Sequence, residues 1–574
     1  MLNNNARIFL WLALVLVLWL NYETWQRDYA PKAVPAAVTA AKANALAGGT
    51  SRSLDASIPD AASSVAVPAV APSAAVANTV PSLPAGPVQT AAASATGVVQ
   101  VRTDVLDLDI SLQGGELRRA DLLQYPLVKG KAEPVRLFNR DGGGFYVMQT
   151  GLAGPAGSLR PTHLAAFTAS ATEYALPAGA GELRVPLVWT DAQGVTVTKT
   201  FVFRRGQYRI DLEYSVDNAS PAPWQAASYA QVLRDDVPIE RSMFNVESYA
   251  FKGPAYYDST KYSKLKIDKE EDRALSRVIQ GGWIAGMQHH FVTAVVPAAD
   301  APYRFNLKVD GQQYLLSAAG PLKTVAAGAT EVFKETLFVG PKLQAQLEKA
   351  GPRLDLVADY GMLTILARPL FWLLEQAHKF SGNWGWAIVM ITFLLKLGFY
   401  PLSEASGRSM AKMRVLAPRI KNLQETYKDD REKLGKAMME MYQREKVNPL
   451  AGCLPILVQM PVFFAFYWVL LESVEMRQAP FMGWIQDLSA KDPFFILPIV
   501  MAGAMFIQYK LNPAPPDPIQ AKVFMILPLV MSVTFAFFPA GLVLYWVTNT
   551  LLSILQQWNI NRKIEAAAAL AKAN

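Results

Sequence analysis

Residues 383–403, NWGWAIVMITFLLKLGFYPLS, decide how the chain is organised, because this stretch is apolar enough to span a bilayer yet contains a lysine, Lys396. A charge inside a membrane span costs roughly 2.5–3.5 kcal/mol on insertion scales and usually faces a protein interior or a wet cavity. Thr392 lies four residues earlier and shares a helix face with Lys396. The alternative is that Lys396 lies near the helix end and extends to the lipid headgroups, since Pro401 follows closely.

The composition of the chain predicts a polytopic membrane protein of two or three domains. Of its 574 residues, 52% are hydrophobic and only 18% are charged, against about 25% charged in soluble proteins. A single cysteine, Cys453, excludes an intramolecular disulfide, and the four histidines show no metal-ligand spacing. The sequence contains no phosphate-loop, zinc-protease or nucleophile-elbow motif. We therefore expect no enzyme, no cofactor and no metal site.

The first 97 residues resemble a membrane anchor followed by a linker. The apolar run 8–20 behind Arg7 predicts a transmembrane signal anchor over residues 1–28, with a cleaved signal peptide as the alternative. Residues 29–97 are rich in Ala, Pro, Ser and Val and show neither helical nor strand periodicity. Such a composition cannot bury a core, and it predicts a flexible tether.

Residues 98–343 show the alternation of a β-domain. Leu106, Leu108, Ile110 and Leu112 alternate with polar residues, and similar runs elsewhere in this region end at Gly turns. This pattern predicts an antiparallel β-sandwich. The region contains no catalytic constellation, so we expect a structural or docking role for it.

Helical spacing returns after the β-domain. Residues 353–380 predict an amphipathic helix lying in the membrane interface, or alternatively a helix of the β-domain. Apolar runs then predict transmembrane helices over residues 383–402, 450–471, 494–509, 523–538 and 541–560, which make six spans with the anchor. The polar segments between and after them are a helical hairpin over 403–448, a loop over 472–493, a loop over 510–522 and a tail over 561–574.

One membrane orientation fits all of these segments. The hairpin carries eleven Lys and Arg residues against seven acids, so the positive-inside rule places it in the cytoplasm. The β-domain and the 472–493 loop then lie outside, and both chain ends lie inside. Within the hairpin, Asp429 and Glu432 form a candidate capping box for the second helix. Four prolines are expected to interrupt the spans: Pro455, Pro461, Pro498 and Pro528.

Several long stretches carry a family pattern. They are GNWGWAIVMITFLLK (382–396), SMAKMRVLAPRI (409–420), EKVNPLAGCLPILVQMPVFFAFYWVL (445–470), VEMRQAPFMGWIQDLSAKDPFFILPI (474–499), FPAGLVLYWVTNTL (538–551) and GGWIAGMQHHF (281–291). These stretches resemble the YidC/Oxa/Alb family of membrane protein insertases in its long, Gram-negative form. The resemblance covers nearly everything except the tether.

The resemblance implies a bacterial inner-membrane protein with a five-helix core around a hydrophilic groove and a periplasmic β-supersandwich. It implies the insertion and folding of nascent membrane proteins, alone or with the Sec translocon. Ribosome, signal-recognition-particle receptor and membrane lipids are further expected partners, and DNA is not. The family's groove cation is most often arginine, whereas Lys396 stands at the matching position. Arginine can hold a carboxylate bidentately, but an ammonium acts as a point charge.

The candidate site residues form three groups. Lys396 would hold an acidic tail, and polar side chains near it would supply hydrogen bonds: Thr392, Gln459, Gln508, Thr548 and Asn549. Aromatic residues would form a greasy slide toward the lipid: Phe463, Tyr545 and Trp546. Hairpin methionines would form an adaptable capture surface: Met410, Met413, Met438, Met439 and Met441.

Each group has an alternative interpretation. The polar residues could instead form interhelical hydrogen bonds, the aromatic residues could serve only packing, and some of the methionines could form the hairpin seam. The competing function is a secondary transporter or channel in which Lys396 binds an anionic solute. The spans, however, show none of the internal repeats that are typical of such transporters.

Overall fold

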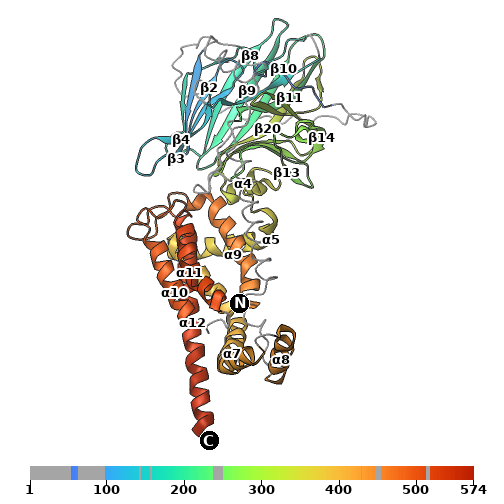
Figure 1. The fold of residues 1–574 in the computed structure, drawn as a ribbon. Helices are drawn as coiled ribbons and strands as arrows, with labels where there is room; N and C mark the ends of the chain where they lie inside the picture. Colours follow the sequence, from blue (N-terminus) through green and yellow to red (C-terminus); the bar gives the residue numbers. More distant parts are fainter. Residues whose placement is uncertain are drawn as a thin grey trace, which may run out of the picture.

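The computed structural model describes residues 54–62, 97–140, 144–155, 158–236, 250–427, 430–445, 454–511 and 518–573. The expected anchor over 1–28 and most of the expected tether lie outside these residues. A β-domain lies at one end of the molecule and a helical domain at the other, with α4 (Gln344–Ala350) and α5 (Thr364–Ser381) between them (Figure 1).

The β-domain contains two large sheets. The first has eleven strands, in spatial order β14 (Ser276–Gln280), β17 (Pro302–Asp310), β18 (Gln313–Ala319), β11 (Trp224–Asp235), β5 (Tyr146–Ala153), β4 (Pro134–Asn139), β3 (Leu117–Pro126), β2 (Leu106–Ser111), β1 (Val98–Arg102) and β7 (Glu173–Ala175), with β19 (Lys323–Val325) beside β11. The second has nine: β13 (Tyr262–Lys264), β12 (Gly253–Tyr257), β15 (Trp283–Met287), β16 (Phe291–Pro297), β20 (Thr330–Pro341), β10 (Arg209–Asn218), β9 (Val195–Arg204), β8 (Glu182–Thr190) and β6 (Thr168–Ala169). A short helix, α3 (Glu270–Arg273), precedes β14.

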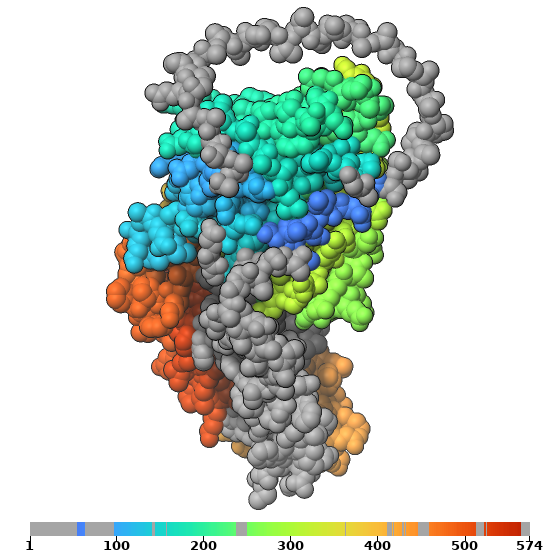
Figure 2. Space-filling model, turned by 90° about the horizontal axis from the view of Figure 1, so that it is seen from above, coloured from blue at the N-terminus to red at the C-terminus, as the bar shows by residue number. Residues whose placement is uncertain are grey.

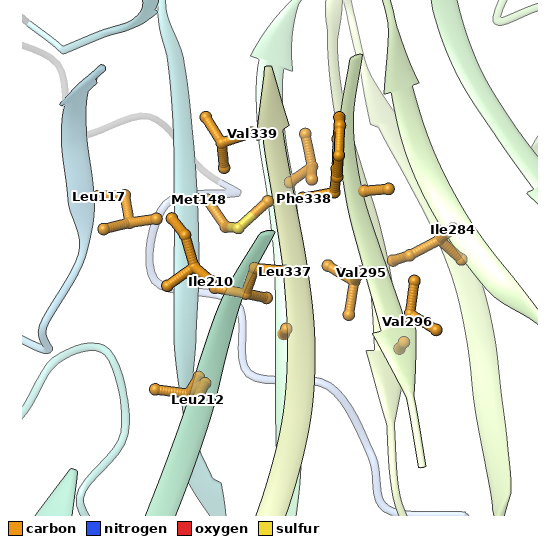
Figure 3. Packing of buried hydrophobic residues seen from close by; sticks show 14 of the residues in the cluster. Leu117, Met148, Ile210, Leu212, Ile284, Val295, Val296, Leu337, Phe338 and Val339 are labelled. Carbon is orange, nitrogen blue, oxygen red and sulfur yellow. The ribbon is translucent and has the colours of Figure 1, made fainter. Parts of the chain in front are cut away.

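Strand alternation produces the core between the sheets. In β2, Leu106 and Leu108 are fully buried, while Asp107 and Asp109, which follow them in turn, both accept hydrogen bonds from Arg119 at 2.7 Å. One buried cluster joins Leu117 and Met148 of the first sheet to strands of the second, including Ile210 and Leu337 (Figure 3). Full burial of each such side chain contributes roughly 1.5–3 kcal/mol.

The segment after the β-domain is less helical than the sequence indicates. Over 353–380, two short 3₁₀ turns, η2 (Leu354–Val357) and η3 (Gly361–Leu363), come first, and α5 begins only at Thr364. The apolar residues before Thr364 lie in turns between the two domains: Leu354 is buried in the core of the β-domain and Tyr360 in that of the helical domain. Leu370 and Leu374 of α5 are also buried, whereas its opposite side exposes large apolar residues: Ile365, Trp372 and Phe380.

The helical domain contains α6 (Trp384–Gly398), α7 (Tyr400–Thr426), α8 (Arg431–Arg444), α9 (Leu454–Glu472), η5 (Val474–Met476), α10 (Ile496–Leu511), α11 (Pro518–Phe535) and α12 (Ala540–Ala573). Three helices differ by four residues or more from the expected boundaries. The Lys396 helix, α6, ends at Gly398 rather than 402, because α7 begins at Tyr400 in a different direction. The start of α11 lies at Pro518 rather than 523, and α12 continues through most of the expected tail, whose Ala-rich sequence favours a helix. The hairpin helices α7 and α8 and the far end of α12 lie at the end opposite the β-domain (Figure 1).

The prolines interrupt these helices less than expected. Pro461 and Pro528 lie inside the continuous helices α9 and α11. Pro455 and Pro498 occupy the first turns of α9 and α10, where a missing N–H leaves no hydrogen bond unmade. Pro401 lies in the first turn of α7, and the helical segments on either side of Phe399 make an angle of 59°.

By length and apolar composition, no single described helix meets the requirement for a membrane span, but the bent pair Trp384–Gly398 and Tyr400–Ser409 does so together. Three shorter apolar helical stretches are Val458–Glu472, Ile496–Leu511 and Met525–Phe535.

Candidate functional site

The start of α6 is fixed by its own cap and by the loop that precedes α10. The Asn383 side chain accepts a hydrogen bond from the Trp386 amide at 3.1 Å, which caps the helix. Its amide group also donates to the Phe481 carbonyl at 2.9 Å. Gly385 lies so close to the Phe481 ring that an added Cβ would be 2.1 Å from a ring carbon. The helix that carries Lys396 is therefore held in one position at its amino-terminal end.

Lys396 belongs to a polar connection between three helices. Its half-buried ammonium group donates to the Ser553 hydroxyl of α12 at 2.8 Å, and that hydroxyl donates to the Asn549 carbonyl at 2.7 Å. The Gln459 amide of α9 donates to the Asn549 side-chain oxygen at 3.2 Å. The structure thus links Lys396 through Ser553 to the main chain of Asn549, and Asn549 through its side chain to Gln459.

Ser553 is a site residue that the sequence interpretation missed. It lies four residues after Asn549 and therefore on the same face of α12, which is a signal that could have identified it. An ammonium group has three N–H donors. Within the described residues, Ser553 accepts one of them and no carboxylate pairs with Lys396. The charge of Lys396 is therefore not neutralised by any acid in this part of the chain.

Other predicted polar residues lie in different surroundings. Thr392 is only 1% exposed, and its hydroxyl donates to the Ile388 carbonyl of its own helix at 2.6 Å. Gln508 of α10 and Thr548 of α12 are half-buried. Their lining of a groove stays a prediction.

The three aromatic residues predicted to form a slide are in contact. Phe463 of α9 stacks on Tyr545 with ring centroids 6.0 Å apart, and it meets the edge of Trp546 at 4.8 Å. Tyr545 is buried, whereas Phe463 and Trp546 are half-buried. Phe464, next to Phe463, is exposed. The cluster therefore extends from the interior of the helical domain toward its apolar surface.

The helical hairpin has a small core of its own. Leu416 and Ile420 of α7 are buried against Met441 and Tyr442 of α8, so Met441 contributes to the seam. Met438 is half-buried and Met439 is exposed. The side chains of Met410 and Met413 lie outside the described residues. The cap of α8 is Asp430, whose side chain accepts from the Lys433 amide at 3.1 Å. Asp429, the predicted cap, lies outside the described residues.

The β-domain is joined to the helical domain at the end of α9. His289 donates to the Leu471 carbonyl at 3.0 Å, and its ring stacks on His290 with centroids 3.8 Å apart. Burial, with the nearby Lys342 charge, lowers the pKa of His289 to about 4. Lys342 and Glu472 form a nearly dry ion pair at 3.9 Å, with side chains 2% and 7% exposed. Burial lowers the pKa of Lys342 to about 8 despite the Glu472 charge.

A second set of contacts reaches the β-domain from the loop after α9. Arg477 donates to the Pro126 carbonyl at 2.8 Å, and the Gln478 side chain donates to the same oxygen at 2.9 Å. In the opposite direction, the Lys129 ammonium donates to the Gln478 carbonyl at 2.9 Å. The β-domain is therefore attached to the loop that also positions α6.

The helical domain exposes many large apolar side chains. They lie on α6, α9, α10, α11 and α12, and include Trp386, Phe393, Leu397, Phe464, Ile499, Phe506, Ile526, Leu529, Val533, Leu551, Leu555 and Trp558. Large apolar side chains exposed in such number indicate a surface that contacts lipid or protein. Among the described residues, no group of three or more His, Cys, Asp or Glu side chains is placed to hold a metal ion.

Known proteins match this chain over almost its whole length. The family model described as 60Kd inner membrane protein matches residues 376–567, and the YidC periplasmic domain model matches residues 98–373. The membrane protein insertase YidC of Thioalkalivibrio sulfidiphilus is 46% identical, over 98% of this chain and 99% of the relative. That of Nitrosococcus oceani is 44% identical, with the same two coverages. Among solved structures, an active YidC insertase with its first transmembrane domain resolved is 18% identical with a TM-score of 0.35, over 80% of this chain and 94% of that one.

Proposed function

The chain belongs to the YidC family of membrane protein insertases, and on this premise we propose that Lys396 receives the polar tail of an incoming membrane segment. Such a tail crosses hydrocarbon at a cost of several kcal/mol for each unpaired charge or backbone group. A cation inside the helical domain lowers this barrier for acidic tails, because it replaces part of the water that the carboxylate loses.

The observation that carries the proposal is the pairing of Lys396 with a neutral partner. A buried carboxylate beside Lys396 would neutralise its charge and leave nothing to attract a substrate. Ser553 instead accepts one hydrogen bond at 2.8 Å and leaves the positive charge intact. Gln459 and Asn549 add amide groups in the same connection, which supports a hydrophilic groove between α6, α9 and α12.

The apolar part of the substrate needs a separate path. In our proposal it leaves along Phe463, Trp546 and the exposed Phe464 toward the lipid. Met438 and Met439 on the hairpin would contact the substrate earlier, since a thioether side chain adapts to different apolar surfaces. Met441 is less suited to this role because it packs in the hairpin seam.

The arrangement of the domains supports one orientation in the membrane. The periplasmic β-domain and the hairpin lie at opposite ends of the helical domain (Figure 1). We propose that the hairpin and the end of α12 face the cytoplasm, where nascent chains, the ribosome and the signal-recognition-particle receptor are available. Cooperation with the Sec translocon is part of the same proposal.

The test is a charge series at Lys396 in the full-length protein, reconstituted into proteoliposomes. Clients with one span and either an acidic or a neutral tail are inserted into the wild type and into the Lys396→Arg, Lys396→Ala and Lys396→Glu variants. We expect Arg to retain insertion of the acidic client and Glu to give the lowest yield, with smaller differences for the neutral client. Lys379→Glu is the matched control, because Lys379 is an exposed lysine of α5.

Equal insertion of the acidic client by all three Lys396 variants would contradict the proposal. Uptake of a small anion that competes with insertion would instead favour a transporter.

A further inference from the structure

Nine residues of the region expected to be a tether, 54–62 (LDASIPDAA), lie against the β-domain, where Figure 2 shows them as a dark blue band. They lie on the outer face of the eleven-stranded sheet. Leu54 packs with Val147, Leu233 and Leu315, whereas their neighbours Met148, Val232 and Leu316 point into the core between the sheets. Successive side chains of a strand point to opposite faces, so the segment covers the face away from that core.

The first contact of the segment is an apolar pocket. Leu54 is buried together with Phe145, Val147, Leu233 and Leu315. This cluster is separate from the main core, and Leu54 is its only member from outside the sheet and its loops. Burial of one leucine side chain contributes roughly 1.5–3 kcal/mol, which is enough to select an aliphatic residue here.

The second contact is specific for an acidic residue. The Asp55 carboxylate accepts from the Arg140 guanidinium at 2.8 Å and from the Gln149 amide at 2.7 Å. Arg140 is shared with the buried Glu116, which accepts from it at 2.6 Å. Charge-assisted hydrogen bonds of this kind are about twice as strong as neutral ones.

The main chain of the segment is also recognised. His163 Nε2 donates to the Asp55 carbonyl at 2.8 Å, and its Nδ1 accepts from the Tyr229 hydroxyl at 2.6 Å, which fixes the tautomer. The buried Gln231 amide donates to the Ser57 carbonyl at 3.0 Å. At the far end, the Ala62 amide donates to the Gly320 carbonyl at 3.0 Å, and Ala62 forms a parallel bridge with Pro321.

We infer that this face of the β-domain is a binding site for a peptide that begins with a turn carrying an aliphatic residue and aspartate, and that residues 54–62 of the same chain are its ligand. An apolar pocket, a carboxylate clamp and three main-chain contacts follow one another along nine residues. Buried polar side chains at the site, Gln149, Gln231 and His163, all donate to the segment, so the site is built for a ligand and not only for solvent.

Docking at Leu54 shortens the connection between the β-domain and the expected anchor. If residue 28 ends the anchor, only residues 29–53 connect it to the docked segment. Those 25 residues reach at most roughly 90 Å when fully extended. Without docking, the connection would run to residue 97 and could be more than twice as long. The site therefore limits how far the β-domain can move from that anchor.

A cysteine pair in the full-length protein tests the docking. In a Cys453→Ser background, Ala62→Cys and Pro321→Cys occupy bridge partners, whose Cα separation of about 4.8 Å is within the range of a disulfide. We expect ready oxidation of this pair in membranes, and at least fivefold slower oxidation when Leu54→Asp is added. Ala61→Cys with Pro321→Cys is the matched control, because the side chain of residue 61 points the other way in an extended segment.

A binding experiment tests the ligand specificity. Residues 54–62 are replaced by nine Gly and Ser residues in the full-length protein, and a fluorescent peptide of residues 52–64 is added in trans. We expect saturable binding to this variant, little binding to the wild type, and at least tenfold weaker binding of an Asp55→Ala peptide. Melting temperatures establish that each variant is folded. Equal oxidation of both cysteine pairs, or equal binding of both peptides, would overturn the inference.

Discussion

The ammonium group of Lys396 in α6 and the hydroxyl of Ser553 in α12 form a hydrogen bond of 2.8 Å. This hydrogen bond joins two helices that lie far apart in the sequence. Because serine is neutral, the bond does not neutralise the charge of Lys396. A neutral acceptor orients the lysine and leaves two of its N–H donors without a partner in the described part of the chain. The proposed function depends on this combination of fixed position and available charge.

Substitutions at Ser553 should distinguish the effect of the Lys396 charge from the effect of the hydrogen bond that orients Lys396. Ser553→Asp places a carboxylate beside Lys396, and we expect it to reduce insertion of an acidic client about as strongly as Lys396→Ala. Ser553→Ala removes only a neutral hydrogen bond, worth roughly 0.5–1.5 kcal/mol, and should have a small effect. Insertion yield in proteoliposomes measures both. Wild-type insertion of the acidic client by Ser553→Asp would contradict the role given to the free charge.

Gly385 should not tolerate a side chain, because its backbone touches the ring of Phe481. A Cβ at residue 385 would lie 2.1 Å from Cδ2 and 2.4 Å from Cγ of that ring. We expect Gly385→Ala to destabilise the protein by roughly 1–3 kcal/mol, as overpacking does elsewhere, measured as a lower melting temperature in detergent.

Two variants serve as controls for this prediction. Gly503 of α10 has nothing within 4 Å of an added Cβ, so Gly503→Ala should leave stability unchanged or raise it slightly. Phe481→Ala should remove the penalty of Gly385→Ala in the double variant. A Gly385→Ala protein as stable as Gly503→Ala would show that the contact with Phe481 is unimportant.

The sequence allowed the β-domain and the site helix to be predicted, because both depend on local patterns. Leu106 and Leu108 alternate with charged residues and are buried in β2 as expected. The long motifs around Asn383 and Phe481 indicate the family, and the structure adds that these two motifs contact each other. Periodicity and long motifs are properties of continuous segments, so they can be recognised from the sequence alone.

Features that depend on distant contacts could not be predicted in this way. Residues 54–62 have the composition of a linker, and only the pocket around Leu54 and the clamp around Asp55 give them a fixed place. Ser553 has no special sequence context, and its importance comes from the approach of Lys396. Likewise, Asp492 looks like an ordinary loop acid, yet it accepts from the Leu497 amide at 2.7 Å and caps α10.

The junction between the two domains should weaken at acidic pH. His289 is neutral in the folded protein, and burial lowers its pKa to about 4 from an ordinary value of 6.5. Between these values the unfolded chain binds a proton that the folded protein does not, so stability is lost as the pH falls from about 6.5 to about 4. The full loss is on the order of 3 kcal/mol for a shift of this size. Melting temperatures at pH 7.5 and pH 5 measure the part of this loss that occurs above pH 5.

His289→Gln is the matched variant, because its amide can donate to the Leu471 carbonyl but does not titrate over this range. We expect its melting temperature to change less than that of the wild type between the two pH values. An identical pH response in both proteins would assign the acid sensitivity to other groups.

The ion pair of Lys342 and Glu472 lies at the same junction. We expect the loss of one partner to destabilise the protein much more than the loss of both. The two side chains are 2% and 7% exposed and their charges are 3.9 Å apart, so removing one partner leaves a buried charge. Glu472→Gln should destabilise the protein toward the lower end of the roughly 3–5 kcal/mol found for broken buried pairs. The double variant Lys342→Met with Glu472→Gln should recover most of this loss, because it leaves no charge to desolvate.

The pH dependence of the Glu472→Gln defect gives an independent check. Burial already lowers the pKa of Lys342 to about 8, and loss of the Glu472 charge should lower it further. An unfolded lysine keeps its proton up to a pKa of about 10.4. Above pH 8 the folded variant can therefore release the proton that the unfolded chain retains, and its stability should rise toward that of the double variant. Melting temperatures of the three proteins at pH 7 and pH 9 measure this convergence. A Glu472→Gln defect that stays constant over that range would show that the Lys342 charge is stabilised by other groups at the junction.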